Sequence, residues 1–203
     1  MREIEQRLNF YALLSRVTMQ ECDSELMKKI FDNTKLLEML PGLAEEKNVI
    51  ETDVEKYIDE VLNVDFTNIF LLHLTPYESF YKREDGMMNT GGSNPVVQFY
   101  EEYNFQIDLT KARAVAADQI GCEMEFMYVV VDSERKAREN KDEAAVKELL
   151  GIQKTFMKEH LLSWAPLFLA QVKNEAETAF YRDFADLALD FLFADYEYIS
   201  EAN

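Results

Sequence analysis

The chain has few of the residues that interrupt helices, form disulfides or ligate metals. It contains six glycines, four prolines, two cysteines and two histidines among 203 residues. All-β proteins use more glycine and proline in turns, so this scarcity favours helices. Cys22 and Cys122 lie far apart and form no CxxC pair, so two buried free thiols are a better expectation than a disulfide.

Long apolar runs are also missing. The longest, residues 126–131, falls far short of the 18 residues that would indicate a membrane-spanning helix. Residues 1–7 carry a charge every few positions and lack the apolar core of a signal peptide. We therefore expect a cytoplasmic protein without stable membrane insertion.

Basic residues are scarce relative to acidic ones. The 21 Lys and Arg face 39 Asp and Glu, which gives a formal net charge of −18. Such a surface repels phosphates, which excludes nucleic acid as a partner and disfavours an anionic membrane surface. A basic peptide is a favoured partner. The 48% hydrophobic content is too high for a disordered acidic chain.

The apolar residues recur with helical spacing along most of the chain. Pro41-Gly42 is expected to stop a helix, Thr52 with Glu55 resembles a capping box, and Asn94-Pro95 resembles a helix start. No βαβ alternation and no repeat of 20–50 residues is present. The expected helices cover residues 3–20, 24–39, 52–62, 65–74, 95–104 and 110–138, and two later ones carry the apolar patterns of 145–156 and 180–194.

The sequence therefore predicts an all-α fold in which residues 1–203 form a single domain. Residues 82–94 contain Gly86, Gly91 and Gly92 and little apolar content. This stretch is the candidate hinge or flexible loop, and two sub-bundles joined there are one form that the domain could take.

No catalytic motif accompanies these helices. His73 and His160 lie outside any HExxH or ExxH pair, and the chain lacks GxxxxGK[ST], GxGxxG and GxSxG. A metal site built from Glu123, Glu125 and a distant histidine remains an alternative. We expect no catalytic residue, no metal and no cofactor, and we interpret the chain as a non-enzyme.

Two stretches stand out for binding. Asp118, Gly121 and Glu125 follow i, i+3, i+7 spacing, which places two carboxylates around a residue without a side chain. These carboxylates hold a cation there, or Gly121 merely permits close helix packing, and spacing alone favours the second interpretation. Trp164 lies in an apolar segment, residues 160–168. We interpret this segment as part of the core, where one helix is followed by the next, rather than as a surface that binds a ligand. We therefore expect Trp164 to be buried.

Four segments together resemble the TorD/DmsD/NarJ family of redox enzyme maturation chaperones, and the likeness extends over about residues 5–195. The matching runs are TPYESFY at 75–81, DQIGCEMEFM at 118–127, HLLSWAPLF at 160–168 and AETAFYR at 176–182. Each run alone is weak evidence, but the four occur in the family's order and at similar separations. Residues 7–15 also have the character of this family.

The resemblance implies a TorD-like helical bundle without chemistry of its own. It implies two clients, a twin-arginine leader peptide and the apo catalytic subunit of a molybdoenzyme, which the chaperone holds until the molybdopterin cofactor is inserted. The monomer and the homodimer both remain open. The peptide-binding residues that we expect on this basis are Tyr77, Glu78, Ser79, Tyr81, Asp118, Gln119, Gly121, Glu125, His160 and Trp164.

The sequence departs from the family pattern at two of these positions. Gln119 stands where the family has histidine, so a contact that depends on a titrating histidine is in doubt there. Tyr77 stands where the family often has tryptophan. Two other functions remain alternatives, a small helical metal-dependent enzyme and a helical regulatory module without a leader client.

Overall fold

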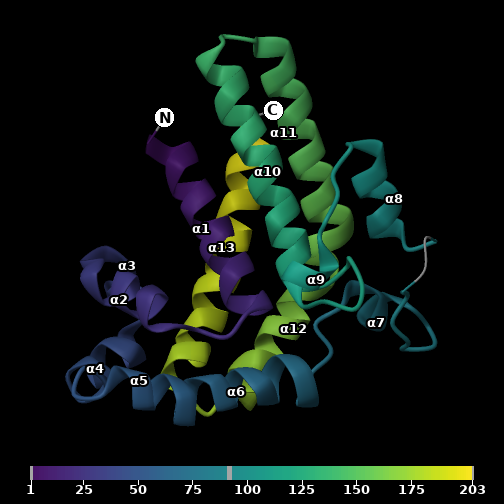
Figure 1. Cartoon of the computed structure of the whole chain (residues 1–203). Coiled ribbons are helices and arrows are strands. Elements are labelled where there is room, and N and C mark those ends of the chain that lie inside the picture. Colours follow the sequence, from purple (N-terminus) through teal and green to yellow (C-terminus); the bar gives the residue numbers. More distant parts are fainter. Residues whose placement is uncertain (1, 91–92, 203) are drawn as a thin grey trace. The chain divides into compact units, whose positions relative to one another are not determined.

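A computed structural model describes residues 2–90 and 93–202, and helices make up most of them (Figure 1). The all-α prediction is confirmed: within these ranges the only β-type pairing is one isolated bridge, between Tyr77 and Gln119. The elements are α1 (Arg2–Met19), α2 (Ser24–Asp32), α3 (Thr34–Glu38), α4 (Pro41–Ile50), α5 (Val54–Tyr57), η1 (Ile58–Leu62), α6 (Asn63–Thr67), η2 (Asn68–His73), α7 (Glu78–Lys82), α8 (Pro95–Glu102), α9 (Leu109–Ala112), α10 (Ile120–Glu139), α11 (Glu143–Phe156), η3 (Met157–Leu161), α12 (Leu162–Glu175) and α13 (Ala179–Glu201), where η denotes a π-helical turn.

The chain divides into two compact units. Unit 1 comprises Met1–Gln20, Pro76–Ala165 and Phe191–Asn203, and unit 2 comprises Glu21–Thr75 and Pro166–Asp190. The candidate hinge at 82–94 therefore lies inside unit 1, where residues 83–90 and 93–94 are non-helical. Gly91 and Gly92 lie outside the described residues. The single domain and the hinge both stay predictions.

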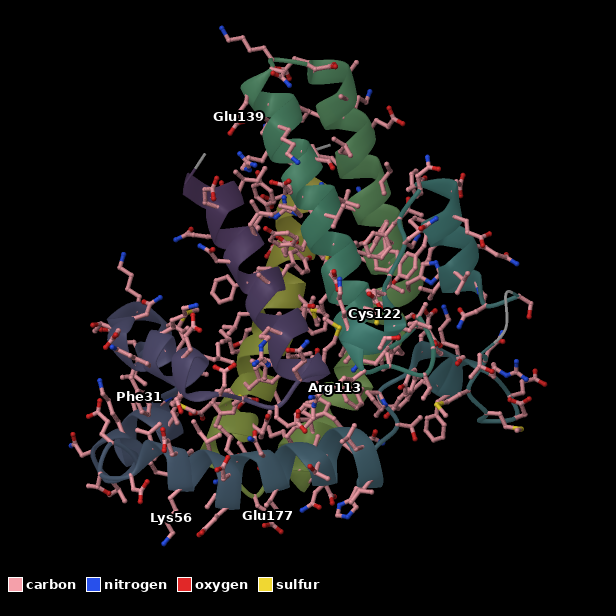
Figure 2. All side chains as sticks on the ribbon, viewed as in Figure 1. Phe31, Lys56, Arg113, Cys122, Glu139 and Glu177 are labelled. Atoms are coloured by element: carbon pink, nitrogen blue, oxygen red, sulfur yellow. The ribbon has the colours of Figure 1, made fainter. Side chains whose placement is uncertain are left out.

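Unit 1 is built on long helices. Figure 1 shows α1, α10 and α11 running side by side, and α1 packs against α10. The apolar stripe expected on the first helix is buried in full, and Tyr11 and Leu14 are completely inaccessible. Cys122 lies near the start of α10 and Glu139 at its other end (Figure 2). Both cysteines are buried, as expected.

Unit 2 contains the short elements from α2 to η2 and parts of α12 and α13. The buried Asp65 carboxylate receives the backbone N–H of Thr178 at 2.8 Å and the Thr178 hydroxyl at 2.6 Å, which fixes the start of α13. The Asp183 carboxylate receives the N–H of Leu43 at the start of α4. Phe70 packs against Phe168 and Tyr181 in the core of this unit. Side-chain caps thus join segments that are distant in sequence.

Several predicted helix boundaries were wrong. Residues 24–39 form two helices because Asn33 ends α2 and its side chain caps α3, and Pro41 begins α4 rather than stopping a helix. Asp53, not Thr52, caps α5. The helix expected from residue 110 begins only at Ile120, so Asp118 precedes it. The start at Asn94-Pro95 is confirmed, with Asn94 accepting the N–H of Val96.

No helix within residues 2–90 and 93–202 combines the length and the apolar character that crossing a bilayer requires.

Candidate functional site

The segment that follows Pro76 is fastened to the chain that leads into α10. The N–H of Glu78 donates to the carbonyl of Asp118 at 3.0 Å, and the N–H of Ile120 donates to the carbonyl of Pro76 at 2.9 Å. Tyr77 and Gln119 form the antiparallel bridge between these two bonds. These contacts place the motif at 75–81 beside the motif at 118–127, although Pro76 and Asp118 are 42 residues apart in the sequence.

Gln119 fixes the start of α10. Its side-chain oxygen accepts the backbone N–H groups of Gly121 and Cys122, and its amide nitrogen donates to the carbonyl of Thr18 at 3.0 Å. The side chain is 96% inaccessible, with an exposed fraction of 4%. A glutamine amide provides the acceptor and the donor that these three contacts need. This position therefore has a structural role here that requires no titrating group.

Gly121 is placed where α1 and α10 approach closely. A Cβ at this position would lie 2.4 Å from Cγ of Met19 and 2.6 Å from the Thr18 hydroxyl. The structure therefore supports the interpretation of Gly121 as a packing residue.

Asp118 is completely buried just before α10. Its Oδ2 accepts the N–H of Ser79 at 2.8 Å, and the Ser79 hydroxyl accepts the N–H of Asn89. Among the described residues, neither Asp118 Oδ1 nor the buried hydroxyl of Tyr100 has a hydrogen-bond partner. The carboxylate that we expected to face a ligand is instead directed at the protein's own backbone, and one of its oxygens is left unsatisfied.

Glu78, Asp118 and Glu123 form what we call the acidic cluster, and His160 and Lys82 are its basic partners. The buried Glu78 carboxylate lies 3.0 Å from Nδ1 of His160 and 2.6 Å from Nζ of Lys82. Burial opposes ionisation of Glu78, but hydrogen bonds and charge from His160 and Lys82 outweigh it and lower the pKa of this carboxyl. Glu78 is therefore a buried carboxylate that is kept ionised.

Glu123 takes the opposite protonation state. It lies on the first turn of α10 with no accessible surface, and both of its oxygens are 3.2 Å from the indole nitrogen of Trp164. Burial, followed by the charges of Glu78 and Asp118, raises the pKa of Glu123 well above its ordinary value. Glu123 is therefore harder to ionise than Glu78, its neighbour in the acidic cluster.

An aromatic rim borders the acidic cluster, and we define it as Phe80, Tyr81 and Trp164. Tyr81 stacks on Trp164 with ring centroids 5.3 Å apart, and Phe80 meets Tyr81 edge to face. Trp164 is 2% exposed, as expected for a core residue, whereas Phe80 is 38% exposed. Partial burial raises the pKa of Tyr81 to about 12, so its hydroxyl stays protonated. The rim presents apolar surface within unit 1.

Met87 and Met88 follow in the loop after α7 and are 63% and 41% exposed. Methionine side chains adapt readily to the shape of an apolar partner. Together with Phe80 they give this part of unit 1 exposed apolar side chains that are close in sequence to the acidic cluster.

Glu125 lies elsewhere. It lines an open pocket of about 450 Å³ formed by α1, α9 and α10, together with Arg16, Lys111 and Tyr128. Burial raises the pKa of Glu125. Asp118 and Glu125 therefore do not flank one cation site, because one is sealed against residues 77–79 and the other opens into this separate pocket.

The structure thus brings most of the predicted residues together but not all of them. Gathered around the acidic cluster and the rim are Tyr77, Glu78, Ser79, Tyr81, Asp118, Gln119, His160 and Trp164. Gly121 faces α1, and Glu125 faces the pocket. That these residues bind a peptide stays a prediction.

Three members of this region were missed by the sequence analysis. Lys82 was detectable, because Glu and Lys at i, i+4 pair on a helix. The sequence offers Glu123 only as an alternative metal ligand and gives no signal for Tyr100. Nothing in the spacing shows that Glu123 faces Trp164 across 41 residues. Among the described residues, no group of three or more His, Cys, Asp or Glu side chains is arranged to hold a metal ion.

Comparison with known proteins places these motifs in a family. The sequence model of the nitrate reductase delta subunit family matches residues 34–170. A protein of Vibrio parahaemolyticus named "Chaperone protein TorD" is 24% identical over 213 residues, which cover 96% of this chain and 95% of the relative. One of the same name from Aliivibrio fischeri is 24% identical over 97% of this chain and 95% of its own length.

A third protein of that name, from Psychrobacter, is 27% identical over 66% of this chain and 60% of the relative. No solved structure matches the chain significantly. The resemblance to the TorD/DmsD/NarJ chaperones is confirmed.

Proposed function

Because the chain belongs to the nitrate reductase delta subunit family, we propose that it is a chaperone for a molybdopterin oxidoreductase subunit. In this proposal it binds the twin-arginine leader and the apo form of that subunit in the cytoplasm and assists cofactor loading before export. It performs no catalysis and holds no cofactor of its own. The relatives named as TorD chaperones along nearly the whole chain support this assignment.

The observation that carries the proposal is the meeting of acidic and aromatic residues in unit 1. A twin-arginine leader offers two guanidinium groups followed by an apolar stretch. Guanidinium groups pair with carboxylates, and an apolar stretch packs on aromatic and methionine side chains. Glu78 of the acidic cluster is buried but contacts the partly exposed Lys82, and the exposed Phe80, Met87 and Met88 lie close to it in sequence, so both kinds of contact are supported in this part of unit 1.

The apolar part of the leader should set most of the affinity. Burial of about 200 Å² of apolar surface contributes ~5 kcal/mol before ordering costs, at ~25 cal/mol per Å². An exposed ion pair contributes only ~0–1 kcal/mol. The arginines should therefore act mainly on specificity and on the association rate, which the net charge of −18 increases for a basic peptide.

Titration calorimetry with three leader peptides at two salt concentrations tests this. We expect the Arg-Arg leader to bind, a Lys-Lys leader to bind within about tenfold of it, and a leader whose apolar run is replaced by Ser and Asn to show no detectable binding. If the protein bound none of the three peptides, the proposed function would be overturned. If the Lys-Lys peptide lost more affinity than the Ser/Asn peptide, charge rather than apolar contact would dominate recognition.

A further inference from the structure

Lys82 holds an unusual position beside the acidic cluster. Its ammonium group lies 2.6 Å from Oε1 of Glu78 and 2.6 Å from the backbone carbonyl of Glu159. The Lys82 side chain is 39% exposed, whereas the Glu78 side chain is 5% exposed. The partly exposed Lys82 thus contacts two acceptors on separate elements, the Glu78 carboxylate on α7 and the Glu159 carbonyl in η3.

Glu78 has a second partner, His160, and this contact allows Lys82 to be replaced. Nδ1 of His160 lies 3.0 Å and 3.2 Å from the two oxygens of Glu78, and the His160 side chain is 7% exposed. If Lys82 moves away, Glu78 keeps this buried partner, so the carboxylate is not left without a hydrogen bond. Lys82 itself has a flexible stem and loses only two contacts, because its ammonium can return to water.

We propose that the Glu78 carboxylate and the Glu159 carbonyl form a subsite for a guanidinium group, and that Lys82 occupies it until a ligand arginine displaces it. This inference deepens the proposed function, on which it rests, by naming where one leader arginine binds. It also makes Lys82 an internal competitor of the client.

The chemistry of the two cations favours the exchange. Lysine offers three donors around one nitrogen, whereas arginine offers five donors on a planar fork that can bond a carboxylate and a nearby carbonyl together. Replacing one cation by another also preserves the charge balance of the acidic cluster, so no buried negative charge is left uncompensated during binding. The exposed Phe80 lies two residues before Lys82 on the same helix, α7.

Three variants test the competition by calorimetry with the Arg-Arg leader. K82Q removes the competing charge, and we expect about fivefold tighter binding, the size of one weak ion pair. K82R places a resident guanidinium in the subsite, and we expect weaker binding than in the unmodified protein. The matched control is K29Q, because Lys29 pairs with Glu25 at the same i, i+4 spacing on α2 but with both side chains at least 70% exposed.

The ranking decides the result. Tightest binding by K82Q, weakest by K82R and no change in K29Q support the subsite. Unchanged or weakened binding by K82Q overturns it. Far-ultraviolet circular dichroism and thermal unfolding of each variant show whether a loss of binding reflects loss of fold, and in that case the ranking is read from the folded variants.

A second measurement follows Lys82 itself in the unmodified protein. Amine-reactive labelling, read by mass spectrometry, should increase at Lys82 when the Arg-Arg leader binds and stay constant at Lys29. Leader binding without any increase at Lys82 would overturn the subsite and leave the proposed function standing. Absence of leader binding altogether would instead overturn the proposed function.

Discussion

Unit 1 contains two buried groups of charged side chains, and they are built differently. The first, which we call the arginine cluster, joins Arg7 of α1 to Glu134 of α10, Gln153 of α11 and Asp195 of α13. Arg138 adds a second cation at Glu134, 2.7 Å away. Its two carboxylates are thus matched by two guanidinium groups, and the acidic cluster has no such balance.

The difference is visible in the protonation of each group. Burial opposes the charge of Arg7, but the hydrogen bond and the charge of Asp195 raise the pKa of Arg7, so it stays ionised. In the acidic cluster the carboxyl groups outnumber their basic partners, one carboxyl retains its proton, and Asp118 Oδ1 is unsatisfied. A balanced cluster fixes helices in place, whereas surplus acceptors next to an exposed cation are what a site for a cationic ligand requires.

The largest expected effect comes from breaking the arginine cluster. Arg7→Met leaves Glu134 and Asp195 buried without their main cation, and we expect a loss of about 3–5 kcal/mol in the free energy of unfolding, measured by urea denaturation. The control is Arg135→Met on α10, which removes partly exposed pairs with Asp132 and Glu139 and should cost no more than ~1 kcal/mol. Equal costs for the two variants would contradict the view that the buried arginine cluster stabilises the fold more than partly exposed ion pairs do.

A matched pair of tyrosine variants compares the clusters directly. The Tyr11 hydroxyl donates to Oδ2 of Asp195 at 2.7 Å, whereas the buried Tyr100 hydroxyl has no partner among the described residues. Tyr11→Phe should cost about 1.5–3 kcal/mol, because it deletes a hydrogen bond to a charged group. Tyr100→Phe should cost nothing or stabilise slightly, because it removes a hydroxyl that is desolvated without compensation. A large cost for Tyr100→Phe would show that the Tyr100 hydroxyl, beside the acidic cluster, makes a hydrogen bond in the folded protein.

The acidic cluster also predicts a pH dependence of stability. The pKa of Glu123 is raised in the folded protein, so unfolding above its ordinary pKa releases a proton and stability falls as the pH rises. Glu123→Gln removes this contribution, which is at most ~1.4 kcal/mol per pH unit for one proton. The groups that face Glu123 are Glu78, Asp118 and Trp164.

Urea midpoints measured from pH 5 to pH 8 check this. The Glu123→Gln curve should lie close to that of the unmodified protein at pH 5 and above it at pH 8. The lowered pKa of Glu78 stabilises the folded protein above the ordinary pKa of a glutamate, and this stabilisation is lost as the pH falls below that value. The effects of Glu78 and Glu123 on stability therefore occupy different pH ranges. The exposed Glu148→Gln on α11 should leave the curve unchanged, and parallel curves for all three proteins would contradict a protonated Glu123.

Much of the fold was predictable from local pattern. The stripe on α1, the start of α8 at Asn94-Pro95 and the burial of Trp164 follow from helical spacing, capping chemistry and size. Failures concentrated at boundaries, where a single side chain decides. Asn33 divides the predicted second helix because its side chain caps α3. Gln119 caps α10, so this helix begins at Ile120, about ten residues later than the sequence pattern predicts.

Helical spacing and the four motifs are thus enough to predict the helical class, the order of the motifs and most of the residues near the site. The role of each of these residues depends on the packing around it, which the pattern of the chain does not reveal. Asp118 and Glu125 are alike in chemistry and seven positions apart, yet one seals against Ser79 and the other opens into a pocket. Glu78 and Glu123 are the same residue type, yet the pKa of Glu78 is lowered and that of Glu123 is raised. The physical reason is that burial and the neighbouring charges set these outcomes, and both come from residues such as His160 and Trp164 that are distant along the chain.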